Sequence, residues 1–259
     1  MSDDRMYHIG FGRADLPAGT TTALLSGDPD RSRLISERYV SDGRELARNR
    51  GLDAFLGTLP GGDPVVCATS GMGAPSLSIV VNELVQLGID TVIRIGTAGS
   101  IQDSVRAGQV VIASGAVTNQ GAAADIAPTE FPAVANPFLT VGLAQAAERV
   151  GAEHHVGVMA SADTFFEGQE RFESSANPHL IRRQRGMIDE YTHLNVLGFE
   201  MEAGTLFKMG VVYGFAAGCV CGIVAQRGEA EAPDLSRKDT AVDNAIRVAV
   251  DAADAWTRR

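Results

Sequence analysis

Short apolar runs, each followed by a longer segment of helical pattern, recur along this chain and restrict the folds that it can adopt. The run TALLS (22–26) precedes DRSRLISERYV (30–40), and PVVCATSG (64–71) precedes PSLSIVVNELVQLG (75–88). Further short runs are TVIRIG, QVVIAS, HHVGVMAS and AAGCVCGIVA. Runs that are apolar on both faces are typical of a mostly parallel sheet covered by helices on two sides. The sequence therefore predicts an α/β fold.

Two segments carry the clearest helical pattern. In residues 75–87 the apolar side chains fall on one stripe, a proline stands in the first turn, and Gly88 suits a helix end. A second long helix is expected over residues 239–256. The glycine and prolines of residues 119–137 predict a long surface loop. No repeat, linker or low-complexity stretch divides the chain, so we expect one domain spanning residues 1–259.

Composition limits the classes of function. The 259 residues are 45% hydrophobic and 21% charged, as in an ordinary globular protein. The formal net charge of −10 argues against a nucleic-acid partner, and an anionic ligand must therefore be captured locally. No apolar stretch reaches the ~18 residues that a membrane-spanning helix needs, and the N-terminus MSDDRMYHIG has no apolar signal region. We expect a cytoplasmic protein without a membrane partner.

The three cysteines, Cys67, Cys219 and Cys221, lie within apolar runs. They are too few, and too deeply placed in these runs, for a disulfide framework or a four-ligand zinc site, so we expect buried, reduced thiols. No Ser-His-Asp or Cys-His arrangement for nucleophilic catalysis is evident, and no metal-ligand spacing is present. The sequence therefore predicts no metal site.

Polar residues of unusual type follow several of the expected strands. GDPDR (27–31) follows TALLS, SGMGAPS (70–76) is a second glycine-rich corner, and IRIGTAGS carries Arg94 and Thr97. Ligands of doubly wound sheets bind beyond the carboxyl ends of the strands. Small residues there let backbone N–H groups approach a ligand, and a guanidinium matches phosphate oxygens. An arginine such as Arg31 also suits a solvated helix surface, whereas Arg94 lies inside an apolar strand and needs a buried partner.

Two later segments place polar side chains beside apolar ones. ADTFFEGQERFE sets Gln169 and Arg171 next to aromatic rings. This pattern suits a planar heterocycle held by stacking and hydrogen bonds, or a surface turn with an apolar anchor. GFEMEAGTLFKMG carries Glu200 and Glu202 at the head of an expected helix. These carboxylates suit capping of the helix, or binding of sugar hydroxyls by one of them, and the residues alone leave both open.

The segments GDPDR, SGMGAPS, RIGTAG, DTFFEGQERF and FEMEAGTLF, in this order and spacing, resemble the nucleoside phosphorylase-I family over nearly the whole chain. The resemblance implies a single α/β domain with a mixed central β-sheet flanked by helices on both faces. GDPDR, RIGTAG and EMEA mark the wider family, whereas GQER after an aromatic resembles its uridine-selective members. The run GIVAQRGEAEAP lacks the aspartate that purine-selective members carry there, which weakens a purine assignment.

Matched position by position, the resemblance implies the residues of the site. The phosphate-binding residues would be Gly27, Arg31, Arg50, Arg94 and Thr97. The ribose-binding residues would be His8, Thr97, Met201 and Glu202. The base-binding residues would be Phe165, Gln169, Arg171 and Arg227. The groups that act on the reaction itself would be Arg94, Glu202, Gln169 and Arg171. His8 and Arg50 would serve a neighbouring subunit, with Arg44 as the alternative match to Arg50.

The resemblance also implies the activity. Phosphate would attack C1′ of uridine, or of deoxyuridine or thymidine, through an oxocarbenium-like transition state and release uracil and ribose-1-phosphate. The alternatives are a purine nucleoside phosphorylase or a nucleosidase of the same fold, and a non-catalytic nucleoside-binding protein.

The implied assembly is a homo-oligomer, at least a dimer with shared active sites and a hexamer in full. No cofactor is expected, since phosphate is a co-substrate. Family members with a glutamate after the trans arginine bind a monovalent cation between subunits, and Gly51 after Arg50 disfavours such a site. If Arg44 and Glu45 are the residues that match the trans arginine and its glutamate, a monovalent cation site is expected again. Residues 228–238 are a candidate lid.

Overall fold

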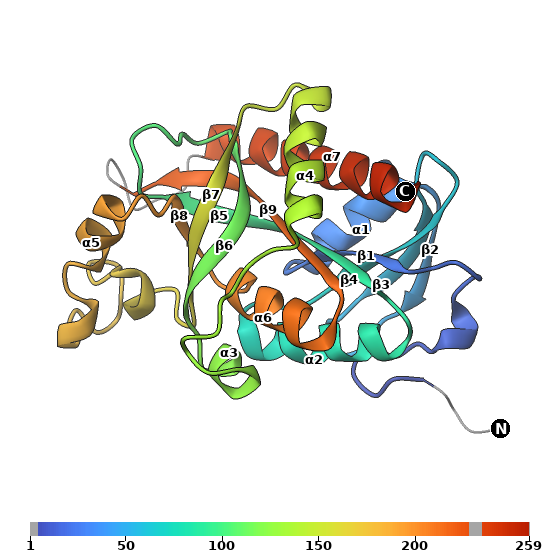
Figure 1. Ribbon diagram of the computed structural model, residues 1–259, viewed down its shortest axis with the longest axis horizontal. Helices are drawn as coiled ribbons and strands as arrows, with labels where there is room; N and C mark the ends of the chain where they lie inside the picture. Colours follow the sequence, from blue (N-terminus) through green and yellow to red (C-terminus); the bar gives the residue numbers. More distant parts are fainter. Residues whose placement is uncertain (1–4, 228–234, 259) are drawn as a thin grey trace.

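The computed structural model describes residues 5–227 and 235–258 (Figure 1). The α-helices are α1 (Pro29–Arg38), α2 (Ala74–Gln86), α3 (Gly121–Ile126), α4 (Pro137–Val150), α5 (Met187–His193), α6 (Ala203–Tyr213) and α7 (Leu235–Thr257). The strands are β1 (Thr22–Ser26), β2 (Ser41–Ala47), β3 (Ala54–Thr58), β4 (Pro64–Thr69), β5 (Thr91–Ser100), β6 (Val110–Asn119), β7 (His154–Ala162), β8 (Gly198–Glu200) and β9 (Ala216–Gln226).

The strands form one mixed sheet in the order β2-β3-β4-β1-β5-β8-β7-β6-β9. β1 lies parallel to both β4 and β5, while β2, β3 and β4 form an antiparallel edge. β9 pairs in parallel with β5 along its length and antiparallel with β6. The pairings from β5 through β8, β7, β6 and β9 therefore return to β5, and this half of the sheet closes on itself. The mixed sheet confirms the expected fold class.

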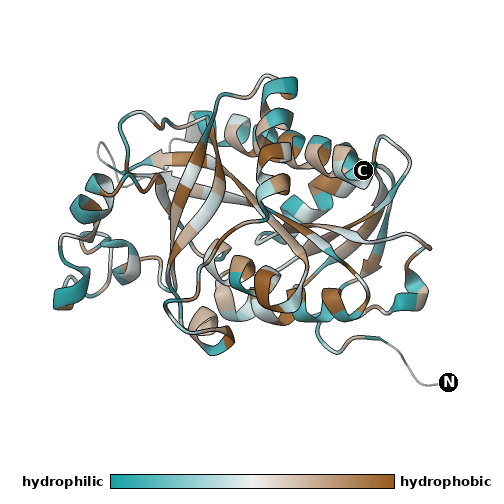
Figure 2. Cartoon of the chain, viewed as in Figure 1, coloured by the Kyte–Doolittle hydropathy of each residue, from teal (hydrophilic) through white to brown (hydrophobic). Residues whose placement is uncertain are grey.

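Helices cover both faces of the sheet (Figure 1). α2 and α6 lie on one face, where Leu77 and Phe207 join the larger apolar core. α1, α4 and α7 lie on the other, where Ile35, Leu143 and Ile246 join a second core. All five residues of β1 are buried, since the sheet is covered on both sides. Figure 2 shows hydrophobic positions along the central strands and both hydrophobic and hydrophilic positions on most helices.

Both helices that the sequence predicted are present, and the prediction of a loop over residues 119–137 is partly wrong. α2 matches its expected segment closely, and α7 begins at Leu235 rather than Asp239. Within residues 119–137, Gly121–Ile126 forms α3, because its run of alanines favours helix and Ala123 is buried. No helix of the described segments is long and apolar enough to cross a bilayer.

The three cysteines are free and buried, as expected. Cys219 and Cys221 point to the same side of β9, with their Sγ atoms 3.7 Å apart. Burial raises the pKa of Cys67 to about 12, so this thiol is protonated at neutral pH.

Candidate active site

A cavity of about 470 Å³ lies at the carboxyl ends of β1, β8 and β9, beside β5. The predicted residues that line it are Gly27, Arg31, Arg94, Thr97, Phe165, Gln169, Arg171, Met201 and Glu202. These residues come from four separate segments of the chain. The structure therefore brings these nine predicted phosphate, ribose and base residues together at one place, as expected for strand ends in an α/β sheet.

The GDPDR segment joins β1 to α1 and carries Arg31 into the cavity. Asp28 caps α1, accepting a hydrogen bond from the backbone N–H two residues on, and Pro29 takes the first helical position. Arg31 consequently stands in the first turn, where its Nη1 donates to the carbonyl of Ile95 in β5 at 3.2 Å. Burial, together with the nearby positive charge of Arg94, lowers the pKa of Arg31 from its ordinary value.

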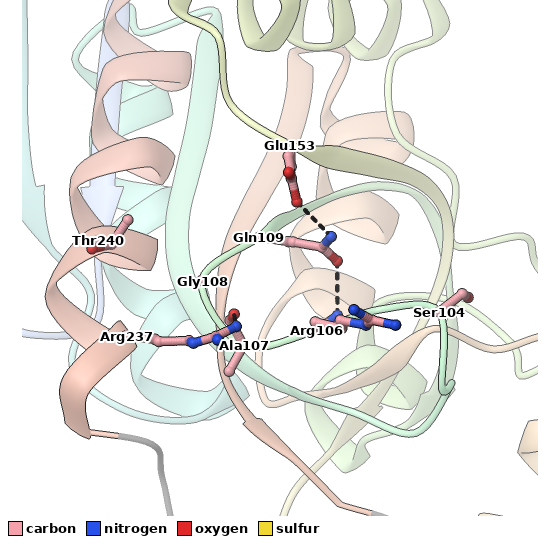
Figure 3. A pocket seen from close by; sticks show the side chains of 8 residues that line it. All are labelled: Ser104, Arg106, Ala107, Gly108, Gln109, Glu153, Arg237 and Thr240. Atoms are coloured by element: carbon pink, nitrogen blue, oxygen red, sulfur yellow. Dashed lines mark hydrogen bonds between the residues drawn. The ribbon is translucent and has the colours of Figure 1, made fainter.

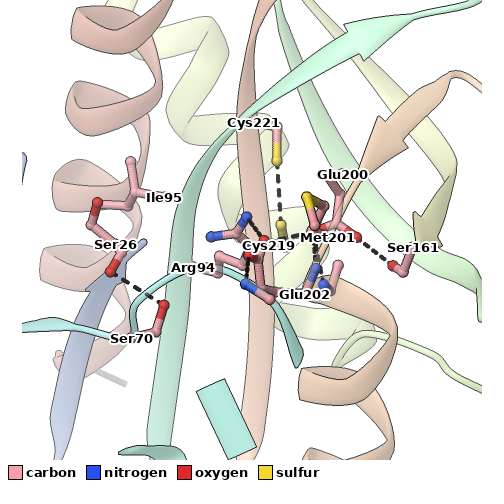
Figure 4. Close-up of polar contacts among 12 residues, drawn as sticks. Ser26, Ser70, Arg94, Ile95, Ser161, Glu200, Met201, Glu202, Cys219 and Cys221 are labelled. Carbon is pink, nitrogen blue, oxygen red and sulfur yellow. Dashed lines mark hydrogen bonds and ion pairs between the residues drawn. The ribbon is translucent and has the colours of Figure 1, made fainter. Parts of the chain in front are cut away.

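Arg94 is the buried arginine that the run TVIRIG predicted, and it is 4% exposed. Its Nε donates to Glu200 Oε2 at 3.3 Å and its Nη2 donates to Glu202 (Figure 4). Gly96 leaves room for the guanidinium, because a Cβ there would lie 3.0 Å from Arg94 Nη2. Burial alone would lower the pKa of Arg94, but the charges of Glu202 and Glu200 outweigh it and raise the pKa.

The Nη1 atom of Arg94 is buried and has no hydrogen-bond partner within the described residues. An unsatisfied buried donor on a charged group costs free energy, and such a donor is normally matched by an acceptor. Because Arg94 lines the cavity, a bound anion is the acceptor that the geometry favours.

The two carboxylates of the EMEA segment differ in position. Glu200 Oε2 accepts from the backbone N–H groups of Glu202 and of the next residue, each at 2.8 Å, and Oε1 accepts from Ser161. Glu200 is thus the helix cap. Glu202 Oε1 accepts from the N–H of Gly73 at 2.6 Å, and the same carboxylate pairs with Arg94. Burial raises the pKa of Glu202, Arg94 opposes this, and Glu200 adds to it, so the net direction is upward.

The predicted base-binding residues Phe165, Gln169 and Arg171 also lie together. A short helical turn (Glu167–Gln169) follows β7 and buries Gln169 and Arg171 at the cavity wall. The guanidinium of Arg171 lies 4.3 Å from the ring centroid of Phe165, and its Nε donates to Gln169 Oε1 at 3.4 Å. Arg227 at the end of β9 donates from Nη1 to the Gln169 carbonyl at 2.6 Å, so it lies beside the cavity rather than in its wall.

His8 and Arg50 lie outside this cavity and close to each other. The side chain of Asn49 donates to the carbonyls of Tyr7 and His8, both at 2.9 Å. His8 Nδ1 lies 2.6 Å from Glu83 Oε1, and the guanidinium of Arg50 lies 5.0 Å from the Tyr7 ring centroid. Neither residue lines the cavity of its own chain, so their predicted roles are not tested within one subunit.

Arg44 and the candidate lid also remain predictions. Arg44 is exposed in β2 and its Nη2 donates to the Asp15 carbonyl at 3.0 Å, again away from the cavity. Most of the segment 228–238 lies outside the described residues, and its last part, 235–238, begins α7.

A second hollow of about 610 Å³ contains none of the predicted site residues (Figure 3). Arg106, Arg237 and Glu153 lie in its wall and are exposed. Gln109 accepts from the Arg106 backbone at 2.7 Å and donates to Glu153 at 2.9 Å. Across the described ranges, no group of three or more His, Cys, Asp or Glu side chains is placed to hold a metal ion.

Three residues that the sequence did not predict, Gly73, Ser161 and Gln120, hold the site residues in place. The N–H of Gly73 donates to Glu202. The backbone at Gly73 has a φ of 88°, a conformation that favours glycine. The glycine-rich run SGMGAPS was a usable signal for it. Ser161 and Gln120 bind the backbone of the first turn of α6, and nothing in their local sequence marks them.

The fold and the cavity define an α/β protein with an arginine-lined ligand site at the ends of its strands, next to a carboxylate and an aromatic-amide cluster. The chain belongs to the phosphorylase superfamily, whose sequence profile matches residues 21–256. This match confirms the family resemblance and the fold class drawn from the motifs.

Individual relatives are similar over nearly the full chain. The chain is 39% identical over 253 residues to the uridine phosphorylase of Escherichia coli strain K12, covering 98% of each protein. It is 39% identical over 250 residues to the uridine phosphorylase of Haemophilus influenzae, covering 96% of this chain and 98% of the relative. The chain is 31% identical over 242 residues to the guanosine phosphorylase of Halorubrum lacusprofundi, covering 90% of this chain and 92% of the relative.

Proposed function

We propose that this protein catalyses the phosphorolysis of uridine to uracil and ribose-1-phosphate. The observation that carries the proposal is the convergence of Arg31, Arg94 and Glu202 with Gln169 and Arg171 on one cavity. The uridine phosphorylases among its relatives support the same assignment, and their identity exceeds that of the guanosine phosphorylase.

Phosphate binds at the end of the cavity lined by Gly27, Arg31, Arg94 and Thr97. The chain as a whole repels anions, so capture depends on these two guanidinium groups. The free Nη1 of Arg94 donates to a phosphate oxygen, while its other nitrogens stay bound to carboxylates. Phosphate is thereby held in position for an in-line attack rather than an encounter from solution.

The ribose lies against Met201, with Thr97 on the phosphate side and Glu202 accepting hydrogen bonds from the 2′- and 3′-hydroxyls. The Glu202 carboxylate is already oriented by Arg94 and by the N–H of Gly73. Its remaining lone pairs are the acceptors that a sugar diol needs.

Uracil lies beside Phe165 and is bound by Gln169 and Arg171, with Arg227 adjacent. A phosphate oxygen forms a bond to C1′ as the C1′–N1 bond breaks, and the bonding pair leaves with uracil. The sugar at the transition state is oxocarbenium-like and lies between two negatively charged groups. The arginine and the amide stabilise charge on the departing base, so no protein nucleophile is needed.

The active unit is a homo-oligomer, at least a dimer and in full a hexamer, in which His8 and Arg50 complete the site of the neighbouring subunit. Their common location outside their own cavity supports this arrangement, since Glu83 and Tyr7 hold both at the surface. No cofactor is required. Gly51 after Arg50 provides no carboxylate for a monovalent cation between subunits.

Incubation with uridine, with and without phosphate, followed by chromatography of the products, tests the proposal. We expect uracil and ribose-1-phosphate only when phosphate is present. Equal release of uracil without phosphate would identify a nucleosidase, and no release in either case would identify a nucleoside-binding protein. Parallel reactions with deoxyuridine, thymidine and guanosine define the substrate range, and a preference for guanosine would overturn the pyrimidine assignment.

A further inference from the structure

The last residue of β6, the first residue of α3 and Gln120 between them contact three separate parts of the protein around the cavity. Asn119 donates from Nδ2 to Tyr191 Oη of α5 at 2.7 Å. The N–H of Gly121 donates to Asp163 Oδ2, at the start of the base-side loop, at 2.8 Å. Gln120, between them, contacts the start of α6. None of the three lines the cavity, so their influence on it is indirect.

Gln120 is buried and uses both ends of its amide. Its Nε2 donates to the Met201 carbonyl at 2.6 Å. Its Oε1 accepts from the backbone N–H of Thr205 at 3.0 Å and from the Thr205 hydroxyl at 2.9 Å. A backbone carbonyl only accepts and a backbone N–H only donates, so these partners determine the orientation of the amide. One side chain thus links the backbone before Glu202 to the backbone after it.

The first turn of α6 is held by side chains from other elements. The first three N–H groups of the helix are accepted in order by Glu200, Ser161 and Gln120. Such groups lack partners within a helix and need acceptors when buried. Gln120 also donates to the carbonyl of Met201, and Glu200 accepts from the N–H of Glu202, so both ends of the peptide directly before Glu202 are held, the carbonyl end by Gln120.

We propose that Gln120 is a positioning residue for ribose recognition, acting through the backbone on either side of Glu202. The inference rests on the proposed function, in which Glu202 accepts from the 2′- and 3′-hydroxyls. Without Gln120, the carboxylate of Glu202 loses its fixed position relative to Arg94 and Gly73. A misplacement of about 1 Å is enough to lower turnover strongly, because catalysis depends on the alignment of reacting groups.

The variant Gln120→Met keeps the length of the side chain and removes all its hydrogen bonds. We expect kcat/KM for uridine to fall about fivefold more than kcat/KM for 2′-deoxyuridine, because only uridine has the 2′-hydroxyl that depends on Glu202. The KM for phosphate should change less than about twofold. A merely structural role would lower the amount of active enzyme and thus affect both nucleosides equally.

Gln102→Met is the matched control. Gln102 is half-buried, and its Nε2 also donates to two backbone carbonyls, those of Thr192 at 3.0 Å and Val196 at 2.9 Å, but it lies outside the cavity. We expect this variant to lower the melting temperature and to leave the ratio of kcat/KM for the two nucleosides unchanged. An equal change of the ratio in both variants contradicts the proposal.

A second variant and a second measurement complete the test. Gln120→Glu keeps the acceptor for Thr205 but replaces the donor to Met201 by an acceptor, and we expect the same loss of the uridine preference. Amide hydrogen exchange of residues 203–206 should be faster in Gln120→Met, which lacks the acceptor for Thr205, than in the unmodified protein, with no change in α2.

These outcomes separate the two proposals. No phosphorolysis by the unmodified protein overturns the proposed function. An active, folded Gln120 variant with an unchanged ratio overturns the role of Gln120 alone, and unchanged exchange overturns its support of α6 whether or not the protein turns over uridine.

Discussion

The candidate active site and the hollow beside Arg106 contain the same kinds of side chain and differ in how the protein holds them. In one, Arg94 is almost fully buried and bonded to two carboxylates, with Glu202 in turn bound to a backbone N–H. In the other, Arg106, Arg237 and Glu153 are all exposed. The presence of arginines and a carboxylate therefore does not by itself make a binding site.

Burial and support account for the difference. A buried guanidinium acts in surroundings of low dielectric, where its attraction for an anion is several times stronger than in water. It also requires partners on every side, and those partners hold it in one orientation. Exposed arginines are hydrated, mobile and screened by salt. The following variants compare matched residues of the two cavities, beginning with the largest expected effect.

Arg94→Ala should lower kcat/KM by roughly a hundredfold or more, because one preorganised contact to the reacting anion is lost. Steady-state kinetics with uridine and phosphate measure this, and circular dichroism verifies the fold. The control is Arg106→Ala, in the other cavity, which should retain full activity. Unchanged turnover in the Arg94 variant would remove this residue from the site.

Glu202→Gln should raise the KM for uridine about tenfold, since a neutral amide is a weaker acceptor for hydroxyls and loses its ion pair with Arg94. The KM for phosphate should rise less. Glu153→Gln serves as the comparison and should leave both constants unchanged. A larger effect on phosphate than on uridine would show that Glu202 acts mainly through Arg94.

Gln169→Ala should weaken discrimination among bases by about tenfold while phosphate binding changes little, because Gln169 lines the cavity and in the proposed function its amide binds the base. Competition between uridine and other nucleosides measures the discrimination. Gln109→Ala removes an amide from the other cavity and should have no effect. Equal losses in uridine and phosphate binding would contradict the assignment.

The smallest expected effect is on the pH profile. Burial raises the pKa of Glu202, so its protonated form appears at a higher pH than for a free glutamate. Once protonated, Glu202 is no longer a charged acceptor for a sugar hydroxyl. We therefore expect kcat/KM for uridine to fall a few-fold as the pH is lowered, and this fall should begin at a pH above the ordinary pKa range of a carboxyl group. The groups facing it are Arg94, Glu200 and the Gly73 N–H. A profile of Glu202→Gln that keeps this acidic limb would exclude Glu202 as its source.

Much of the fold and of the cavity wall followed from local patterns. Apolar runs identified strands such as β1, and a proline with a glycine marked the ends of α2. Arg94 was recognisable because an arginine inside an apolar strand is rare. The segment 119–137 was misjudged, since its alanines form α3 only where they pack against α6.

The roles of the two carboxylates in EMEA depended on the folded chain. Glu200 and Glu202 lie two residues apart, and the residues alone left capping and sugar binding open for both. In the structure both carboxylates line the cavity and bind Arg94, but Glu200 also accepts from the backbone at the start of α6, whereas Glu202 accepts from the N–H of Gly73. Ser161 and Gly73, which are distant in sequence, hold the two carboxylates in these different positions.

The amino-acid sequence by itself determined the kind of sheet, the strand ends that carry chemistry and the family, because these depend on periodicity and on short runs of contiguous residues. Only the tertiary structure decided which groups face the cavity, that the sheet closes through β5 and β9, and that Gln120 supports α6. Those outcomes arise from hydrogen bonds and packing between residues far apart in the chain, and burial makes each of them strong enough to select a single arrangement.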